Sequence, residues 1–449
     1  MIVIKFGGTS VQDAQAIGRV ISIVEDRLAE KPVVVVSALA RVTRLLVKIA
    51  EEAKMQNQRA VSDLMAQLRE RHVALSRELI SDGPILADCL SSINSQCDSL
   101  SDFAEGVCRI GELSLRSNAR IISTGEMLSS TIIAAAMNDK GLKAKWLDAR
   151  RMIITNDDYM SARPDMEETE GDIRWLIPEA FKGADVILTQ GFVASTKEGS
   201  TSVLGFEGSD YSAAIFGMAL RASRVEIWTD VDGIRTADPR VVDDTCRIEK
   251  VSYEEAASMA WLGARVLHPL TIEPARSRNI PIYVKNSYNI PCEGSAVVRG
   301  DLSTSGPKSI AFREDIDYLE VRSRTLTGTE TMTARVMDIL TSRRIKVCLL
   351  NYSQALLCLT LEKDQPGFDE ALSEISALGE ATLYRDKAQL SVVGKDVVEL
   401  SGLRDTVRSC AGKVSMIHDD PVGMSESYVV DLAGVRETVK ELHKRLFGK

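Results

Sequence analysis

The chain has 449 residues and a net charge of −9, and 45% of its residues are hydrophobic and 27% are charged. This length exceeds one ordinary hydrophobic core and this composition is typical of a soluble globular protein, so we expect two to four domains. The acidic balance argues against a nucleic-acid-binding protein, because such proteins usually carry a basic patch. No apolar run reaches the roughly 18 residues of a membrane helix, so we expect no membrane partner.

The cysteines and histidines argue against two further classes. Eight cysteines are scattered without a Cys-x-x-Cys pair, and the chain has only four histidines. We therefore expect neither a zinc site nor a disulfide framework, and interpret the cysteines as reduced thiols. The first residues start directly as a strand, without a signal peptide. These features predict a cytoplasmic protein.

The N-terminus is typical of a strand, a glycine turn and a helix. Residues 2–6 form a short apolar run that contains Lys5, Gly7 and Gly8 follow, and a helix is predicted over 13–29. Such a turn can be a plain chain reversal, or it can bring backbone amides up to a phosphate. A charge inside an apolar strand is costly unless it faces a site, so Lys5 favours the phosphate interpretation.

The following segments alternate between strands and helices. Residues 33–36 are four valines, typical of a central parallel strand, and a loop over 37–43 leads to a helix over 44–54. Helical periodicity over 61–108, broken near 81–84, predicts a helical hairpin. Further strands are predicted at 144–148, 186–190, 225–229 and 281–285, and further helices at 171–181, 211–222 and 253–262. The alternation favours a predominantly parallel sheet covered by helices on both faces.

Two local features of this region concern a candidate site. Residues 121–126 end in Gly125-Glu126 and lead into a helix that runs to about residue 138. Near a helix start, Glu126 could simply complement the helix dipole. Residues 191–205 are rich in Ser, Thr and Gly, which predicts an exposed hairpin or flap.

The stretch over 204–240 carries the densest polar motifs. Two glycines and a Ser-Asp pair within 205–210 directly precede a helix, whose first N–H groups lack internal partners and can hold an anion. A buried strand over 225–229 is followed by Thr229-Asp230 and Asp238-Pro239-Arg240. Open α/β sheets bind their ligands at the carboxyl ends of strands, so these clusters predict a ligand site.

The C-terminal third has a different pattern. Near residue 300 the composition turns to Asp, Ser, Thr, Gly and Pro, which predicts a linker over 301–315. The order strand-helix-strand-strand-helix then occurs twice, over 316–384 and 385–449. Two small α+β modules behind a catalytic domain over 1–300 indicate a ligand-sensing or dimerisation region. A second catalytic lobe is the alternative, but the tail has no polar cluster like that of 204–240.

Six motifs follow one another along the chain. They are Lys5-Phe6-Gly7-Gly8-Thr9-Ser10, Gly125-Glu126, Gly205 with Gly208-Ser209-Asp210, Trp228-Thr229-Asp230-Val231-Asp232-Gly233, Thr236 with Asp238-Pro239-Arg240, and Gly263-Ala264-Arg265-Val266-Leu267-His268-Pro269. Together they resemble an aspartokinase of the amino-acid kinase family, across nearly the whole chain. The tail resembles the paired ACT domains by which such enzymes dimerise and sense end-product amino acids.

The resemblance implies a fold and an activity. The fold would be an α/β amino-acid kinase domain, with a predominantly parallel sheet sandwiched by helices, followed by two ferredoxin-like ACT modules. The activity would be ATP-dependent phosphorylation of the L-aspartate side-chain carboxylate, with Mg²⁺ on the nucleotide phosphates. The partners would be a small amino-acid substrate, an amino-acid effector at the ACT-like modules and a second copy in a homodimer.

Site residues follow from the same resemblance. Lys5 and Asp210 would be the catalytic pair, with Lys5 on the transferring phosphoryl group. The substrate-binding residues would be Thr43, Glu126, Gly208 and Asp210. The nucleotide-binding residues would be Lys5, Phe6, Gly7, Gly8, Ser209, Thr229, Asp230, Arg235, Arg240, Arg265 and Val266. No metal site made by the protein alone is expected.

The substrate loop departs from the family pattern. The family usually has an arginine at the position of Phe206, and Glu207 follows it here. By the resemblance, that arginine would hold a substrate carboxylate through a bidentate bond. Such a bond stabilises by roughly 1.5–3 kcal/mol, so the loss of the arginine could weaken substrate binding by roughly one or two orders of magnitude. Arg41, where the family prefers glycine, or Arg44 is our hypothesis for the replacement cation. The alternatives to an aspartokinase are a kinase for another small carboxylate and a regulatory paralogue that binds nucleotide without catalysis.

The nucleotide and effector positions also depart. Arg265 stands where a lysine is usual and Arg235 where a tyrosine is common, which predicts a more cationic nucleotide pocket. In the tail, Thr331 and Cys348 stand where the lysine-sensing pattern has a glycine and an aspartate. Without that carboxylate the ammonium group of a bound lysine lacks a partner. We therefore predict weak or absent inhibition by lysine.

Overall fold

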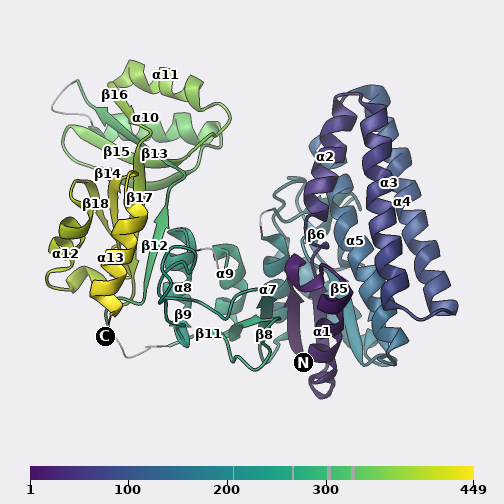
Figure 1. Ribbon diagram of the computed structural model, residues 1–449. Coiled ribbons are helices and arrows are strands. Elements are labelled where there is room, and N and C mark those ends of the chain that lie inside the picture. The colour runs from purple at the N-terminus through teal and green to yellow at the C-terminus, as the bar shows by residue number, and fades with distance from the viewer. Residues whose placement is uncertain (206, 265–266, 301–304, 325–328, 449) are drawn as a thin grey trace. The chain divides into compact units, whose positions relative to one another are not determined.

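The computed structural model describes residues 1–205, 207–264, 267–300, 305–324 and 329–448. The chain forms two compact units (Figure 1): the first holds Met1–Ile234 and Leu267–Arg299, and the second holds Arg235–Val266 and Gly300–Lys449. The expected division at residue 300 therefore differs from the observed one, because the segment from Arg235 folds with the C-terminal part. Among the described residues, no helix combines the length and the apolar character that crossing a bilayer requires.

A mostly parallel sheet forms the centre of the first unit. Within this unit its strands lie in the order β3-β5-β2-β1-β8-β10-β11, and of the strand pairs described there only β10–β11 is antiparallel. They span Ala144–Trp146, Val186–Gln190, Pro32–Val36, Ile2–Phe6, Val225–Thr229, Ile282–Asn286 and Ser295–Val298. Every residue of β1, β2 and β5 is buried, as expected for strands covered on both faces. The predicted parallel sheet is confirmed.

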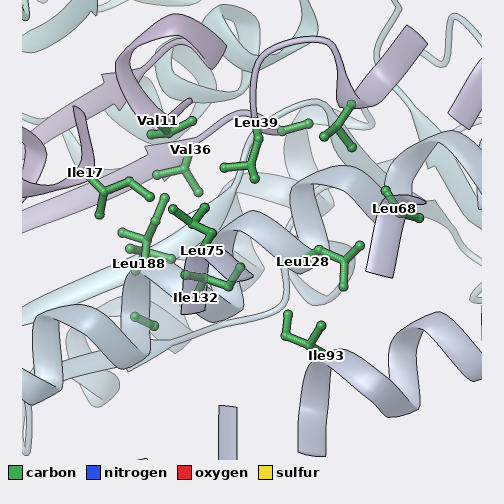
Figure 2. Close-up of a cluster of buried hydrophobic side chains, with 14 of the residues drawn as sticks. Val11, Ile17, Val36, Leu39, Leu68, Leu75, Ile93, Leu128, Ile132 and Leu188 are labelled. Carbon is green, nitrogen blue, oxygen red and sulfur yellow. The ribbon is translucent and has the colours of Figure 1, made fainter. Parts of the chain in front are cut away.

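Helices cover this sheet. They are α1 (Ala14–Glu25), α2 (Val42–Lys54), α5 (Leu115–Asp139), α6 (Met166–Ala180), α7 (Gly208–Leu220) and α9 (Pro269–Ser277). The predicted hairpin is present as α3 (Gln58–Leu79) and α4 (Pro84–Ile110), two long helices that run side by side in Figure 1. Figure 2 shows part of the apolar core that joins sheet, helices and hairpin, with Val36 and Leu188 from the sheet, Leu128 from α5, and Leu68 and Ile93 from the hairpin.

The segment ending in Gly125-Glu126 corrects one expectation. It lies in the middle of α5, which begins at Leu115 after a Ser114 cap, so Glu126 is not at a helix start. Gly125 instead allows close helix packing: a Cβ there would lie 2.9 Å from the Cβ of Ala38 and 3.1 Å from the Cδ1 of Leu46. The helix-dipole interpretation of Glu126 is therefore wrong.

The predicted hairpin over 191–205 is present but is not exposed. Strands β6 (Val193–Thr196) and β7 (Thr201–Val203) pair antiparallel, and β4 (Ile154–Thr155) pairs with β6. All four residues of β6 are buried, and exposure is confined to the turn around residues 197–199. The hairpin is therefore part of the packed domain and not a free flap.

The second unit contains two antiparallel sheets. The first, β14-β15-β13-β16, is formed by Val347–Tyr352, Leu356–Glu362, Ile316–Arg322 and Glu380–Tyr384 and carries α10 (Thr329–Ser342) and α11 (Phe368–Leu378). The second, β12-β17-β19-β18, is formed by Ser309–Arg313, Lys387–Val393, Ser425–Asp431 and Val414–Asp419 and carries α12 (Leu403–Ala411) and α13 (Val435–Phe447). We call these sheets with their helices the first and second ACT-like modules.

The predicted repeat is confirmed, with two differences. Strand β16 was not predicted, and β12 lies inside the segment expected to be a linker. Both add an antiparallel strand at the edge of their sheet. The segment that precedes the modules in this unit also holds β9 (Lys250–Ser252) and α8 (Tyr253–Trp261), which begins with a capping box formed by Ser252 and Glu255.

Candidate active site

A buried ion pair joins strand β1 to helix α7. The Nζ of Lys5 lies 2.5 Å from the Oδ1 of Asp210, and each side chain is 10% exposed. Lys5 is the fourth residue of β1 and Asp210 lies in the first turn of α7. Buried charges are stable only when paired, so each of these two residues accounts for the other. The structure thus brings together the two residues expected to be catalytic.

The glycine turn after β1 brings main chain close to Lys5. The Gly7 N–H donates to the Trp228 carbonyl at 3.1 Å, and a Cβ at Gly7 would lie 3.5 Å from the Lys5 Nζ. A Cβ at Gly8 would lie 3.1 Å from the Ala38 carbonyl oxygen. The Phe6 ring is buried and stacks on Trp228, so this residue can offer a ligand only its backbone. The turn therefore presents main chain, and not side chains, next to the ammonium group.

The start of α7 is held against the end of β5. Glu207 has a left-handed backbone (φ 53°) at the N-cap, and Ser209 and Asp210 are 9% and 7% exposed. A Cβ at Gly191 would lie 2.6 Å from the Ser209 Cβ, and one at Gly208 would lie 2.9 Å from the Phe192 Cδ2. The helix N-terminus therefore occupies a fixed position. Phe206, the departure at the family's arginine position, lies outside the described residues.

Glu126 is a buried acidic side chain, and one of its carboxyl oxygens lacks a described hydrogen-bond partner. It is 4% exposed, and among the described residues its Oε2 has no hydrogen-bond partner. Burial raises the pKa of Glu126 to about 8, although the Ala38 amide donates to the carboxylate. An oxygen of this kind suits a bound cation such as an ammonium group. Thr43, also expected to bind substrate, is half-buried in the first turn of α2.

The nucleotide-binding predictions fall in both units. In the first, Thr229 ends β8 and its Oγ1 donates to the Oδ1 of exposed Asp230 at 3.2 Å. In the second, the Arg235 Nε donates to the Thr245 Oγ1 at 2.6 Å. Exposed Arg240 pairs with Asp238 at 2.6 Å. Arg265 and Val266 lie outside the described residues.

Sequence reasoning missed the residues that hold this site in shape. Ala38 donates its amide to Glu126, and Gly191 and Phe192 contact the start of α7. The Phe192 N–H also donates to the Ser212 Oγ at 2.9 Å. A signal was present, because all three residues lie within two positions after predicted strands, at the carboxyl edge of the sheet, where ligands bind.

Comparison with known proteins gives one family throughout. The model of the amino acid kinase family matches residues 1–286. The lysine-sensitive aspartokinase 3 of Escherichia coli is 31% identical over 457 residues, covering 100% of this chain and 99% of that protein. The chloroplastic aspartokinase 3 of Arabidopsis thaliana is 30% identical over 464 residues, covering 99% of this chain and 81% of that protein.

Solved structures agree with this result. E. coli aspartokinase III in complex with aspartate and ADP (R-state) has a TM-score of 0.88 at 30% identity, with 100% of both chains covered. The same enzyme in complex with lysine and aspartate (T-state) has a TM-score of 0.81, with 100% of this chain and 99% of that chain covered. The chain therefore belongs to the amino acid kinase family. Within that family it groups with the aspartokinases, so the resemblance inferred from the motifs is confirmed.

Proposed function

We propose that the chain transfers the γ-phosphoryl group of ATP to the side-chain carboxylate of L-aspartate and so forms 4-phospho-L-aspartate. The observation that carries the proposal is the buried Lys5–Asp210 pair next to the glycine turn. The similar E. coli enzyme, whose structure holds aspartate and ADP, supports the choice of substrate and the use of a nucleotide. The reaction would belong to amino-acid biosynthesis, on the route to lysine and threonine.

In the proposed reaction an aspartate carboxylate oxygen attacks the γ-phosphorus. The bond from that phosphorus to the bridging oxygen breaks, and ADP leaves with the electron pair. Phosphoryl transfer depends chiefly on positioning and on neutralising the charge that spreads over the oxygens. Lys5 would supply a positive charge at that group, and Asp210 would hold the Lys5 ammonium in place. The Gly7 and Gly8 backbone would lie beside the same group.

Glu126 would select an amino acid as the acceptor. Its buried carboxylate can pair with the substrate ammonium, and this pairing would compensate for the cost of ionising Glu126 in its apolar surroundings. Thr43 and Gly208 would complete the substrate site. Arg41 or Arg44, both exposed at the start of α2, would supply the cation that binds the α-carboxylate of the substrate.

In the first unit, the nucleotide would be bound by Gly7, Gly8, Ser209, Thr229 and Asp230. Among the described residues no group of three or more His, Cys, Asp or Glu could cage a metal ion. Mg²⁺ often binds through one or two carboxylates and substrate phosphates, so exposed Asp230 suits a Mg²⁺ held mainly by ATP. When bound, the ion would neutralise phosphate charge.

We also propose a cytoplasmic homodimer whose ACT-like modules bind an amino-acid effector.

A hydroxamate assay with ATP, Mg²⁺ and a panel of amino acids and small carboxylates tests this function. Hydroxylamine displaces phosphate from an acyl phosphate to give a hydroxamate, which forms a coloured complex with added Fe³⁺, so each acceptor is scored directly. We expect product with L-aspartate and little with the other acids. Product with a different acid alone would assign the chain to another carboxylate. No product with any acid, together with measurable ATP binding, would indicate a regulatory protein.

A further inference from the structure

The glycine turn after β1 is attached to the end of β8 at one carbonyl group. The Gly7 N–H donates to the Trp228 carbonyl at 3.1 Å, and the Ser10 Oγ lies 3.3 Å from the same oxygen. The Ser10 N–H donates to the Gly7 carbonyl at 2.9 Å, and Ser10 is 1% exposed. The position of the turn therefore depends on where the Ser10 hydroxyl is held.

This hydroxyl is held by Ser287, the residue directly after β10. The Ser287 Oγ lies 2.8 Å from the Ser10 Oγ and 3.1 Å from the Thr229 carbonyl oxygen at the end of β8, and Ser287 is fully buried. A hydroxyl has one proton to donate and can also accept. One serine can thus donate to the other, which donates to a carbonyl, so both protons are used and the two serines stay linked.

The residues on either side of Ser287 repeat these two attachments. The Tyr288 hydroxyl donates to the Thr9 carbonyl at 2.8 Å, which gives a second bond to the glycine turn. The Asn286 side-chain amide donates to the Asp232 Oδ1 at 2.8 Å, in the loop that follows β8. The segment just after β10 therefore holds the ends of β1 and β8 together, and all of these residues belong to the first unit.

These hydrogen bonds bear on the site because the glycine turn lies beside Lys5. A Cβ at Gly7 would lie 3.5 Å from the Lys5 Nζ, so a shift of the turn changes the surroundings of this ammonium group. A buried hydroxyl pair adds little net stability, because an apolar pair of the same shape avoids its desolvation. Its main effect is on position, and a displacement of about 1 Å at a reacting centre can slow the reaction about 100-fold.

We propose that Ser287 is a positioning residue for phosphoryl transfer, which acts through the Ser10 hydroxyl on the glycine turn beside Lys5. The inference rests on the proposed function, under which Lys5 and this turn hold the transferring phosphoryl group. It extends the site to the end of β10, a strand that contains none of the six motifs. The aspartate site at Glu126 should not depend on Ser287, because none of the described hydrogen bonds of Ser287 reaches Glu126.

Four single variants of the full-length chain test the proposal. Ser287→Ala removes the link, and the two carbonyls concerned keep their bonds from backbone N–H groups, so this variant should fold. Ser10→Ala removes the partner hydroxyl, and Tyr288→Phe removes the neighbouring bond but keeps the ring. Ser427→Ala is the matched control, because it breaks the buried 2.7 Å hydroxyl pair of Ser391 and Ser427 in the second ACT-like module.

The hydroxamate assay with L-aspartate at saturating ATP gives kcat and the aspartate KM, and thermal melting measures folding. We expect Ser287→Ala and Ser10→Ala each to lower kcat about 3- to 10-fold, the effect of one hydrogen bond on the transition state. Their double variant should lose less than the product of the two single losses, because both remove the same link. Tyr288→Phe should lower kcat about threefold at an unchanged melting temperature, because this side chain is partly exposed.

The aspartate KM separates positioning of the phosphoryl group from damage to the whole site. It should stay within about twofold of the original value in all four variants, because the link acts in the transition state and not on aspartate binding. Ser427→Ala should keep the original kcat, whatever its loss of melting temperature.

Two results would overturn the inference alone. One is an unchanged kcat in folded Ser287→Ala while the original chain forms hydroxamate; if that variant does not fold, an unchanged kcat in Tyr288→Phe has the same consequence. The other is an equal loss of kcat in Ser427→Ala at the same loss of melting temperature, because it would reduce the effect to general destabilisation. An original chain that forms no hydroxamate with L-aspartate would instead refute the proposed function, and the inference with it.

Discussion

Lys5 and Asp210 form an ion pair at 2.5 Å between the end of a central strand and the first turn of a helix far along the chain. The pair is nearly buried, so its geometry is set by packing and not by solvent. A positive charge held in place in this way needs no rearrangement when negative charge develops on a transferring phosphoryl group. The tight contact between Gly191 and Ser209 keeps the carboxylate side of the pair equally fixed.

The buried carboxyl of Glu126 predicts a pH-dependent affinity for aspartate. With a pKa of about 8, the carboxyl is mostly protonated at neutral pH, whereas a substrate ammonium binds its ionised form. Aspartate KM should therefore fall as pH rises from 6 to 8. Glu126→Gln should raise KM about tenfold or more, the effect of one charge-assisted bond, and should flatten this pH profile. Initial rates at saturating ATP measure both, and an unchanged profile in the variant would contradict the assignment.

The same carboxyl also links stability to pH. Its folded pKa is about 8 against an unfolded value of 4.5, so between these values the folded state binds more protons. The free energy of unfolding should therefore decrease as pH rises through this window. Glu126→Gln should show a weaker decrease in parallel denaturant titrations, which provides an activity-independent control on the pKa.

Arg41 has a left-handed backbone with φ 71°, at a position where the family prefers glycine. A non-glycine residue in this region costs on the order of 1 kcal/mol, so Arg41→Gly should leave the melting temperature unchanged or raise it slightly. If the guanidinium holds the substrate carboxylate, the same variant should raise aspartate KM about tenfold. Arg44→Ala, which leaves the loop backbone alone, tests the neighbouring arginine. Unchanged kinetics in both variants would exclude these residues as the replacement cation.

Two glycine substitutions separate close packing at the site from ordinary helix stability. Gly191→Ala would place its Cβ 2.6 Å from the Cβ of Ser209, so we expect about 1–3 kcal/mol of destabilisation and a lower kcat. Gly171→Ala lies within α6, where nothing is within 4 Å of the new Cβ, and should stabilise by about 1 kcal/mol. Denaturant titration measures both. A Gly191→Ala chain as stable and active as the original would show that this contact can relax.

The surroundings of Cys348 in the first ACT-like module lead us to expect little inhibition of the activity by lysine. The Sγ of Cys348 lies 3.0 Å from the Nη1 of Arg313, and Arg313 also pairs with Glu362 at 3.1 Å. Burial raises the pKa of the Cys348 thiol to about 11, so this thiol is neutral. A lysine ammonium there would meet a neutral thiol and a nearby guanidinium, and not a free carboxylate. Titration of the activity with lysine and, in parallel, threonine tests this, and strong lysine inhibition would refute it.

Much of the fold was predictable because its local signals are strong. The strands Val186–Gln190 and Val225–Thr229 match their predicted ranges, since each is a short apolar run with a clear end. The helix start at Ser114 was missed because it lies in a polar stretch, and Glu126 was consequently misplaced. The assignment of the segment after Ile234 to the C-terminal unit depends on long-range contacts such as Thr236 with His443, which no local pattern reveals.

The site was predictable in its residue types and less so in its geometry. The glycine turn, Lys5 and Asp210 were found from motifs, and the structure confirms that the two charges meet. Packing between distant elements leaves the Oε2 of Glu126 buried without a described hydrogen-bond partner, and it brings Gly191 against Ser209. Such contacts follow from the assembled core and have no periodic signature in the sequence.

The most direct test of the central claim compares the original chain with Lys5→Met in the hydroxamate assay, using L-aspartate, ATP and Mg²⁺. Removing a preorganised charge from a developing oxyanion typically costs about 100-fold or more in kcat. We expect hydroxamate from the original chain with L-aspartate, and at least about a 100-fold lower rate from a folded Lys5→Met variant. No product from the original chain with L-aspartate, or equal rates from the two proteins, would contradict the account.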